Sequence, residues 1–384
     1  MARTYDVIVI GAGSTGVPAA MALAEKKLST LVLESCPSPG QMNNKKAIGG
    51  IRATHSDFGK IQICLRSIQI FSEWEEKTGV DLGWLKHGYS FPAYSDADEK
   101  KLKDLMNIQH SYGLDIGWVS PQEYNELVPG INMDGLRGAT YSPGDGSASP
   151  LLALNAFYFK SLERGAQFNF HENVIAIRSH SGRGFDVVTN QGTYCSRYIV
   201  NAAGNNGGVI AALVGQHYSI KPDNHEGAIT EPVKRFFGPM IVDMRPSKDS
   251  KNYYFYQNTE GQVVFCITPE PAIVGVDNDS TSDFFPMVAK RMVTLYPRLA
   301  NLKVRRSWRG QYPNTLDGFP IVGGSHELSG FINAIGMCGQ GFMIGPGLGE
   351  LISRMVTGEL NDDDRHILQS FDLYRDFSGM EAFK

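Results

Sequence analysis

The stretch IVIGAGSTGVPAAMALAEKKLSTLVLES, residues 8–35, decides how the beginning of the chain folds. Its glycines follow residues 5–10, a short apolar run rich in β-branched residues that is typical of a buried parallel strand. Residues 17–26 then place alanine, methionine and leucine at helical spacing, and residues 30–33 form a second apolar run. The sequence therefore predicts a strand, a tight glycine turn, a helix and a second strand.

Three glycines in this turn, Gly11, Gly13 and Gly16, have the spacing G-x-G-x-x-G. In this context Gly11 makes the tight turn, Gly13 lets the backbone approach a pyrophosphate, and Gly16 lets helix and strand pack closely. The phosphates are expected to bind the unpaired N–H groups at the start of the helix, where the helix dipole favours negative charge.

Glu34 ends the second strand, where its carboxylate can accept hydrogen bonds from ribose hydroxyls. The same negative charge repels a 2′-phosphate, which disfavours NADP. The beginning of the chain therefore predicts an adenine dinucleotide site and leaves FAD and NAD open.

At 384 residues the chain is long enough for two domains. Its 42% hydrophobic and 20% charged residues are ordinary for a globular protein, and with a net charge of −4 neither nucleic acid nor an anionic membrane is expected as a partner. No apolar run approaches the roughly 20 residues that span a bilayer, and the apolar N-terminus carries Asp6, unlike a signal peptide. Five scattered cysteines without metal-ligand spacing indicate reduced thiols, a cytoplasmic protein and no metal site.

The remaining elements suggest one nucleotide domain in three separated pieces, because parallel-type strands with helices occupy the start, the middle and the end of the chain. The segments between them alternate apolar and polar residues as antiparallel strands do. The expected helices span residues 56–77, 96–110, 120–127, 150–164, 282–299 and 345–356, and the expected strands span residues 88–94, 167–177, 198–202 and 330–335, with antiparallel strands across 227–267.

The expected fold class is therefore α/β, and α+β overall: a Rossmann-like nucleotide domain with an inserted, mainly antiparallel substrate domain. The expected boundaries are residues 1–85, 145–220 and 318–384 for the nucleotide domain and residues 86–144 and 221–317 for the substrate domain.

Later glycine-rich stretches favour FAD over NAD. YIVNAAG (residues 198–204) lets the backbone run close to a flat or phosphorylated ligand. FINAIGMCGQGFMIGPGLGELI (residues 331–352) predicts a strand, a glycine turn and a second helix start, whose N–H groups could face the carbonyl edge of a flavin and stabilise its anionic reduced ring. Nicotinamide enzymes need no second glycine-rich helix start.

Taken together, these motifs resemble the D-amino-acid-oxidase-like flavoproteins, with the closest subgroup being sarcosine oxidase, dimethylglycine dehydrogenase and the β subunits of sarcosine oxidase and proline dehydrogenase. The resemblance covers nearly the whole chain, and it is carried by GAGSTG with Glu34, AIGGIR (47–52), GDGSASP (144–150), VNAAG (200–204), HEGAITEP (225–232), TLDGFPIVG (315–323) and GMCGQGFM (336–343).

This resemblance implies an FAD-binding domain and oxidation of the C–N bond of a small amino acid or N-methyl amino acid of the proline, sarcosine or glycine type. The family mechanism delivers hydride from the carbon beside a neutral amine nitrogen to flavin N5. The residues expected to contact FAD are Gly11, Gly13, Ser14, Thr15, Gly16, Glu34, Ser35, Lys45, Lys46, Ala47, Gly49, Gly50, Val174, Ala202, Ala203, Gly204, Asp317, Gly336, Gly339, Gln340, Gly341, Phe342 and Met343.

Departures from the family pattern narrow this expectation. Where some members attach FAD through histidine or cysteine, this chain has Lys46 and Gly310, so noncovalent FAD is expected. The histidine that attaches FMN in some β subunits, expected near Ser149, is also missing. The strand GQVVFCI (residues 261–267) lacks the lysine that activates oxygen in monomeric oxidases. Because a cation stabilises superoxide as it forms, a dehydrogenase is expected, with further subunits carrying FMN, FAD or iron–sulfur acceptors.

The resemblance also implies how the substrate binds. Arg52 matches an arginine that clamps the substrate carboxylate, while a second cation of the clamp is replaced by Met343, for which Arg309 is a possible substitute. His55 and His225 are expected to serve packing or hydrogen bonding, since the chemistry needs no strong base. The residues expected in the catalytic site are Arg52, Tyr254, Tyr256, Arg309 and Tyr312.

Two alternatives stay open at this point. An amino-acid oxidase would use oxygen as the acceptor and oxidise the same substrates. A non-catalytic subunit would bind FAD and only relay electrons, which the weakened carboxylate clamp would allow.

Overall fold

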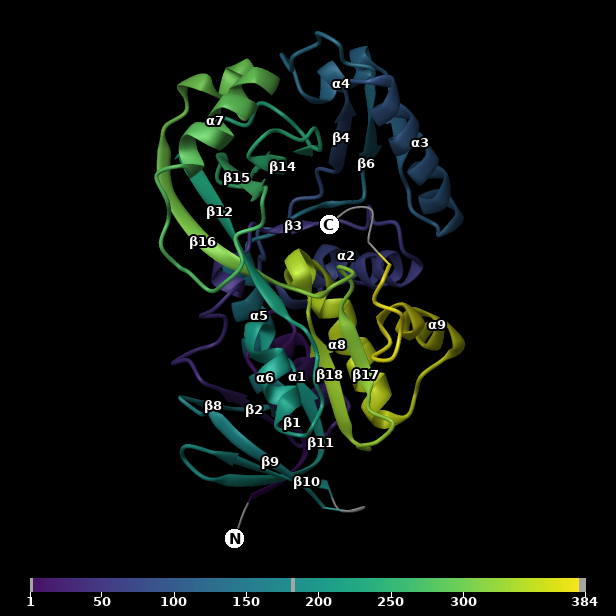
Figure 1. Cartoon of the computed structure of the whole chain (residues 1–384), viewed down its shortest axis with the longest axis vertical. Coiled ribbons are helices and arrows are strands. Elements are labelled where there is room, and N and C mark those ends of the chain that lie inside the picture. The colour runs from purple at the N-terminus through teal and green to yellow at the C-terminus, as the bar shows by residue number, and fades with distance from the viewer. Residues whose placement is uncertain (1–2, 181–183, 380–384) are drawn as a thin grey trace.

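The computed structural model describes residues 3–180 and 184–379, which form two large sheets, one in the lower and one in the upper half of Figure 1. In the lower sheet β1 pairs in parallel with β2 and β11, β2 with β8, and β11 with β18. The order is β17 (Ile321–Gly324), β18 (Phe331–Ile335), β11 (Thr193–Asn201), β1 (Arg3–Ile10), β2 (Thr30–Glu34) and β8 (Gln167–Phe170). β10 (Gly184–Thr189) pairs antiparallel with β11, and β9 (Val174–His180) pairs antiparallel with β10.

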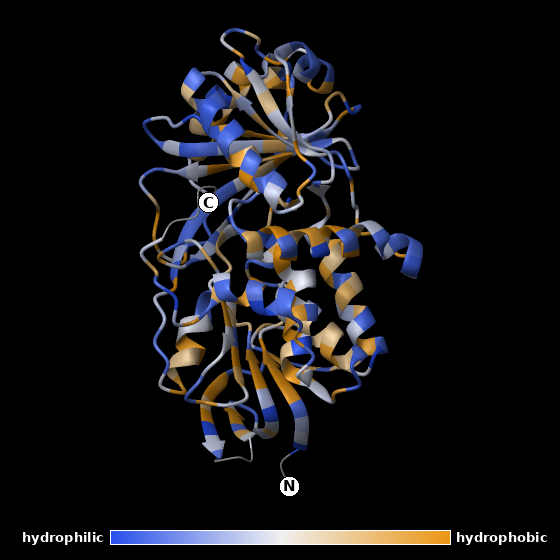
Figure 2. Ribbon diagram, turned by 90° about the vertical axis from the view of Figure 1, so that its right-hand side faces the viewer, coloured by the Kyte–Doolittle hydropathy of each residue, from blue (hydrophilic) through white to orange (hydrophobic). Residues whose placement is uncertain are grey.

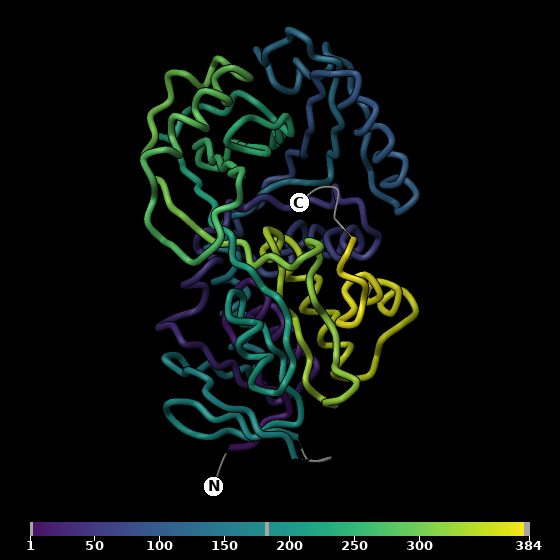
Figure 3. Tube along the Cα trace, viewed as in Figure 1, coloured from purple at the N-terminus to yellow at the C-terminus, as the bar shows by residue number. Residues whose placement is uncertain are grey.

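The upper sheet is antiparallel except where β13 runs parallel to β4. Its strands come from two distant parts of the chain, which lie side by side in Figure 3 as a blue segment and a green segment. The order is β16 (Val304–Asn314), β12 (Lys221–Pro232), β15 (Gln262–Pro269), β14 (Ser250–Gln257), β13 (Met240–Asp243), β4 (Tyr89–Ala93), β6 (Gly138–Ser142) and β5 (Gly117–Val119). A short pair, β3 (Gly50–Ile51) and β7 (Gly146–Ser147), completes the strands of the described residues.

Helices cover both sheets, and Figure 2 shows hydrophobic residues concentrated in the strands of the lower sheet and the helices beside them. The lower sheet packs one face on α1, α2, α5 and α8, and the other on α6 and the β9–β10 ribbon. The helices are α1 (Gly16–Glu25), α2 (Phe58–Thr78), α3 (Asp96–Ser111), α4 (Pro121–Leu127), α5 (Pro150–Glu163), α6 (Gly207–Ala212), α7 (Phe284–Leu295), α8 (Gly341–Thr357) and α9 (Asp362–Phe371), with short 3₁₀ turns η1 (Asn44–Lys46), η2 (Gly204–Asn206), η3 (Pro297–Asn301) and η4 (Cys338–Gln340).

Capping residues explain where several helices begin. The Ser120 hydroxyl accepts the Glu123 N–H while the Glu123 carboxylate accepts the Ser120 N–H, which is the reciprocal pair that the sequence predicts for α4. The Ser95 hydroxyl caps α3 in the same way by accepting the Asp98 N–H.

The predicted strand 167–177 and the predicted helix 282–299 are each wrong in one respect. The strand is broken into β8 and β9, because the backbone turns at His171 with φ 58° and Glu172 donates its N–H to the Glu34 carbonyl. The helix is replaced by α7 and η3, because Pro297 disfavours a helical conformation at the residue before it. The last long helix begins at Gly341, four residues before the predicted Gly345.

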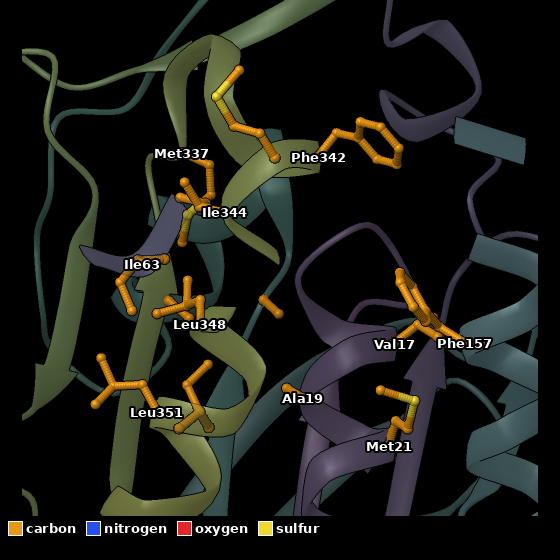
Figure 4. Packing of buried hydrophobic residues seen from close by; sticks show 14 of the residues in the cluster. Val17, Ala19, Met21, Ile63, Phe157, Met337, Phe342, Ile344, Leu348 and Leu351 are labelled. Carbon is orange, nitrogen blue, oxygen red and sulfur yellow. The ribbon is translucent and has the colours of Figure 1, made fainter. Parts of the chain in front are cut away.

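Glycines let α8 pack closely on both of its neighbours. A Cβ atom on Gly345 would lie 2.0 Å from the Ser14 carbonyl oxygen, and one on Gly349 would lie 2.6 Å from the Pro18 backbone of α1. On the other side, a Cβ atom on Gly347 would lie 2.6 Å from the Ile63 carbonyl oxygen of α2. Larger residues of α8 fill the space between these contacts and belong to a buried hydrophobic cluster. Figure 4 shows two of them, Leu348 and Leu351.

We expect Gly345→Ala to lower the free energy of unfolding by about 1–3 kcal/mol, because the added methyl meets backbone atoms that cannot rotate away. Thermal unfolding of both proteins measures this loss. Gly117→Ala is the matched control, since a Cβ atom there has no neighbour within 4 Å. Equal stability of the Gly345 variant and the control would contradict the close packing of α8.

Candidate active site

A cavity of about 720 Å³ lies between the two sheets. Its lower wall includes Ile10, Glu34 and Ala202, which end or follow β1, β2 and β11. The carboxyl ends of parallel strands are where open α/β sheets bind ligands. Its upper wall is the inner face of the antiparallel sheet, so residues of both sheets can contact one ligand.

The three glycines of the first turn differ in their surroundings. A Cβ atom on Gly11 would lie 2.6 Å from the Ala202 carbonyl oxygen, and one on Gly16 would lie 1.9 Å from the Gly11 carbonyl oxygen. These two glycines therefore permit backbone contacts. A Cβ atom on Gly13 would meet nothing within 4 Å, and Gly13 lines the cavity, so space for a ligand lies directly in front of it.

The Glu34 carboxylate is held in a fixed orientation at the cavity. One oxygen accepts the Ala12 N–H at 2.7 Å, and the other accepts the Cys36 N–H at 2.8 Å. These bonds hold the carboxylate next to the glycine turn, where it still has lone pairs for ribose hydroxyls.

Gly49 and Gly50 let β3 pass beneath two tyrosines of the upper sheet. A Cβ atom on Gly50 would lie 1.9 Å from the Tyr89 hydroxyl, and one on Gly49 would lie 2.8 Å from the Tyr256 hydroxyl. Tyr256 donates its hydroxyl to the Ile48 carbonyl at 2.6 Å and does not line the cavity. Its contact with β3 joins the two walls of the cavity.

Lys45 and Lys46, on η1, have different surroundings. Lys46 lines the cavity, packs its side chain on Gly310 and donates to Asn278, whereas Lys45 is exposed and donates to Gln41. Burial, and then the charge of Lys45, lower the pKa of Lys46.

The second glycine turn brings the start of α8 to the cavity. Residues 339–343 all line it, and the Gln340 Oε1 atom is buried without a hydrogen-bond partner. Gly336 and Asp317 lie outside the lining, and Asp317 instead pairs with Arg375 at 2.7 Å.

Alternation along the strands decides which residues of the upper sheet face the cavity. On β16, Trp308, Gly310 and Tyr312 line the cavity and Arg309 does not, while residues 311, 313 and 314 line it at the end of the strand. The Arg309 guanidinium points to the other face of the sheet, where it is paired with Asp277 at 2.6 Å. The structure therefore does not bring Arg309 to the place of a carboxylate clamp.

Every second residue of the neighbouring strands continues this wall. The alternating lining residues of the upper sheet are Trp308, Gly310 and Tyr312 on β16, Asp223, His225 and Gly227 on β12, Cys266 and Thr268 on β15, Asn252 and Tyr254 on β14, Val242 on β13, and Tyr89 and Phe91 on β4. Lys251 on β14 and Gln311, Pro313 and Asn314 on β16 line the cavity in addition.

Four polar side chains meet in the middle of this wall. The Tyr254 and Tyr312 hydroxyls are 2.8 Å apart, and the His225 ring stacks on the Tyr312 ring with centroids 3.8 Å apart. His225 Nε2 lies 3.2 Å from Asp223 Oδ2, within hydrogen-bond distance. Sequence reasoning missed Asp223, because the pairing of Asp223 with Tyr312 across β12 and β16 joins residues 89 positions apart. For His225 the sequence predicts packing or hydrogen bonding, and the structure shows both.

Arg52 lines the cavity just after β3 and donates to the carbonyl of Thr54 and, at 3.4 Å, to its hydroxyl. Behind it Asp145 is fully buried and accepts the Ala53 N–H at 2.9 Å. Burial raises the pKa of the Asp145 carboxyl to about 7, although the Ala53 N–H and the Arg52 charge act in the opposite direction.

Most of the residues expected at the site share this one cavity. Among the expected residues, the lining includes Gly11, Gly13, Ser14, Thr15, Glu34, Ser35, Lys46, Ala47, Gly49, Gly50, Arg52, Val174, Ala202, Ala203, Gly204, Tyr254, Tyr312, Gly339, Gln340, Gly341, Phe342 and Met343. Those outside the lining are Gly16, Lys45, Tyr256, Arg309, Asp317 and Gly336.

The residues present fit FAD. Open space in front of Gly13 at a helix start suits a pyrophosphate, and Glu34 suits a ribose. Buried polar atoms without partners, Asn205 Nδ2 and Gln340 Oε1, belong to residues that line the cavity and need hydrogen bonds that a polar ring system can supply.

The fold and this cavity define a dinucleotide-dependent enzyme with a separate substrate wall. Residues 6–355 match the family described as FAD dependent oxidoreductase, and the chain belongs to that family, with FAD as its cofactor.

Known relatives cover nearly all of the chain. It is similar to the structure of L-proline dehydrogenase from P. horikoshii, with a TM-score of 0.90, 28% identity and 98% coverage of both chains. It is 25% identical to glycine oxidase of Geobacillus kaustophilus, over 93% of this chain and 94% of the relative. It is also 24% identical to mitochondrial sarcosine dehydrogenase of Mus musculus, over 97% of this chain but only 41% of that longer protein.

Within residues 3–180 and 184–379, no helix is long and apolar enough to cross a membrane. Across the same residues, no group of three or more His, Cys, Asp or Glu side chains could hold a metal ion.

We expect Asp145→Asn to stabilise the protein above pH 7 but not at pH 4. The unfolded carboxyl loses its proton near pH 4, whereas the folded one keeps it until about pH 7, so wild-type stability falls as the pH rises between these values. An asparagine has no charge to bury at any pH. The variant should therefore gain up to about 4 kcal/mol relative to the wild type above pH 7.

Denaturant unfolding of both proteins at several pH values measures this gain. Asp134→Asn, on an exposed turn, serves as the control for loss of a carboxylate. A gain of the same size at pH 4 and pH 8 would show that the Asp145 carboxyl is ionised at both.

Proposed function

We propose that this chain is an FAD-dependent amino-acid dehydrogenase that oxidises the C–N bond of a small amino acid or N-methyl amino acid of the proline, sarcosine or glycine type. One observation carries the proposal. Arg52 and the hydroxyl pair of Tyr254 and Tyr312 line the same cavity as the glycine-rich start of α8. A guanidinium and phenols are suited to bind a substrate carboxylate beside a redox cofactor.

The relatives support this substrate class. Their names give glycine, sarcosine and L-proline as compounds that are oxidised or dehydrogenated, and all three compounds carry a carboxylate and an amine on one carbon skeleton.

The residues of the chain have separate tasks in this reaction. Arg52 binds the carboxylate, and the tyrosine pair orients it by donating one hydroxyl proton outside the pair. Phe91 and Val242, together with Met343 across the cavity, supply apolar surface that excludes water from the amine carbon. FAD, when bound, supplies the two-electron acceptor.

We also propose that FAD is held without a covalent bond. Lys46 and Gly310 stand where some relatives of the family carry the linking residue, and here the Lys46 side chain simply packs on Gly310.

The electron acceptor in this proposal is not oxygen. The positions of β15 that line the cavity are Cys266 and Thr268, neither of which carries a positive charge that could stabilise superoxide. The chain then acts as the β-type subunit of a larger complex and passes electrons to other subunits that carry FMN, FAD or iron–sulfur centres.

Two further assignments belong to the proposal. The first is the division into an FAD-binding domain (1–85, 145–220 and 318–384) and a substrate-binding domain (86–144 and 221–317). The second is a cytoplasmic location, which the five cysteines, none of them in a disulfide, support.

We expect one of L-proline, sarcosine or glycine to bleach the visible spectrum of the bound flavin under anaerobic conditions. Acid should release the flavin, because it is not covalently bound. Admission of air should restore the oxidised spectrum slowly, and an artificial acceptor such as a quinone dye should restore it fast. Fast reoxidation by air would instead establish an oxidase, and a flavin that stays oxidised with every amine, D-amino acids included, would point to an electron-relay subunit.

We expect Arg52→Lys to weaken binding of the amino-acid substrate by about 10- to 100-fold, since a charge-assisted hydrogen bond contributes about 1.5–3 kcal/mol. The concentration dependence of flavin reduction measures this effect. Arg309→Met is the contrasting variant, because Arg309 is buried against Asp277 outside the cavity. It should lower Tm and leave substrate affinity within about twofold. The opposite pattern would make Arg309 the carboxylate ligand.

A further inference from the structure

Asp223 and His225 form a buried hydrogen-bonded pair in the cavity wall, and the tasks above do not use it. The two side chains are 10% and 5% exposed, and both residues line the cavity. Two of their atoms, Asp223 Oδ1 and His225 Nδ1, are buried without a hydrogen-bond partner. Buried polar atoms are nearly always paired in folded proteins, so unpaired ones in a cavity wall indicate a ligand or a proton that completes them.

The contact between the two residues fixes which ring nitrogen of His225 can accept a proton. An ionised carboxylate can only accept hydrogen bonds, so His225 must donate Nε2–H to Asp223 Oδ2. The neutral ring then carries its lone pair on Nδ1, the atom that has no partner.

The His225 ring is also held in place from the side of α8. It stacks on Tyr312 at an interplanar angle of 23°. Tyr312 in turn packs against Gly339 of the second glycine turn, where a Cβ atom would lie 2.6 Å from the tyrosine ring. The histidine is therefore fixed relative to the helix start that faces the cofactor.

The titratable groups around His225 are Tyr312 on β16, Cys266 on β15 and Tyr254 on β14, with Arg52 as a permanent charge opposite. Lys46 also lies near, because its side chain packs on Gly310, the residue paired with His225 across β12 and β16, and burial lowers its pKa. Burial raises the pKa of the Cys266 thiol to about 12 and raises the pKa of both tyrosines as well. Asp145 titrates near pH 7 but lies behind Arg52, outside the lining.

We propose that His225, oriented by Asp223, accepts the proton of the substrate ammonium group. This inference rests on the proposed function, because an amine in its ammonium form has no lone pair to support oxidation at the neighbouring carbon. The N–H bond of the ammonium breaks and an Nδ1–H bond forms, directly or through one water molecule. The resulting imidazolium is stabilised by the Asp223 carboxylate.

The substrate then loses two electrons, and the proposed function already supplies FAD as their acceptor. The Cα–H bond breaks, its electron pair goes to FAD, and the nitrogen lone pair forms the C=N bond of the iminium product. The proton stays on His225 until the product leaves. His225 is thus a catalytic base, and Asp223 is the residue that positions it.

The test compares His225→Gln and Asp223→Asn with the wild type in anaerobic flavin reduction between pH 6.5 and 9.5. We expect the rate constant of reduction to fall about 100-fold or more in the His225 variant near pH 7. Raising the pH should recover the rate, because solvent then removes the ammonium proton. The Asp223 variant should fall less and recover in the same direction.

A second readout separates proton transfer from damage to the cavity. Methoxyacetate and tetrahydrofuran-2-carboxylate resemble sarcosine and proline but have oxygen in place of nitrogen. Their binding, followed by the shift that they cause in the flavin spectrum, should change less than about threefold in His225→Gln, since neither carries an ammonium proton.

Matched control variants come from a second Asp–His pair outside the cavity. His180 and Asp186 form a similar contact at 2.8 Å on the exposed β9–β10 ribbon. His180→Gln and Asp186→Asn should leave both the reduction rate and its pH dependence unchanged.

Two outcomes would overturn the inference and spare the proposed function. The first is an unaltered reduction rate and pH profile in His225→Gln. The second is a loss of binding of the oxygen analogues as large as the loss of the reduction rate with the amine. Failure of every amino acid to reduce the wild-type flavin would overturn the proposed function itself, so the two failures are distinguishable.

Discussion

The contact of Gly345 with the Ser14 carbonyl oxygen is the constraint on which the site depends. It brings α8 against the first glycine turn, so two helix starts face one cavity from neighbouring positions. Each start offers unpaired N–H groups and the positive end of a helix dipole. One suits the pyrophosphate of FAD and the other suits the electron-rich edge of a reduced flavin ring. A side chain at residue 345 would separate them, which explains why the sequence places glycines along this face of α8.

The upper sheet forms the other wall of the cavity and contacts the lower one at its edge. Gly49 and Gly50 allow Tyr256 and Tyr89 to reach the β3 backbone, and the Tyr256 hydroxyl bonds to the Ile48 carbonyl. This contact sets the distance between the two walls. Tyr312 and Gly339 meet in the same way at the other end. Small residues on the nucleotide side and aromatic residues on the sheet side thus determine the height of the cavity.

Elements that form through contacts within a few residues could be predicted from the sequence. The strand–glycine–helix unit, the Ser120 capping box and α3 form from contacts within a few residues, and the structure has them. The break of the strand 167–177 depends on the Glu34 carbonyl of a distant strand, which no local pattern reveals. The orientation of Arg309 is similar, because its neighbours Trp308 and Gly310 face the cavity only through the pairing of β16 with β12. The motifs predicted the loops that line the lower part of the cavity, whereas the side chains of the upper wall depend on the register of six strands.

The register of β12 also places the Asp223–His225 pair in a buried position of this wall. Burying a carboxylate with one bond at 3.2 Å is costly, and apolar side chains of similar size would stabilise the sheet better. Neighbouring groups do not relieve this cost, since the phenols of Tyr254 and Tyr312 bond mainly to each other. A protein that keeps such a pair loses stability in return for a place where charge can change by one proton. That change is useful only where a substrate arrives as a cation and must leave its proton behind, which is the situation of an amino acid in this cavity.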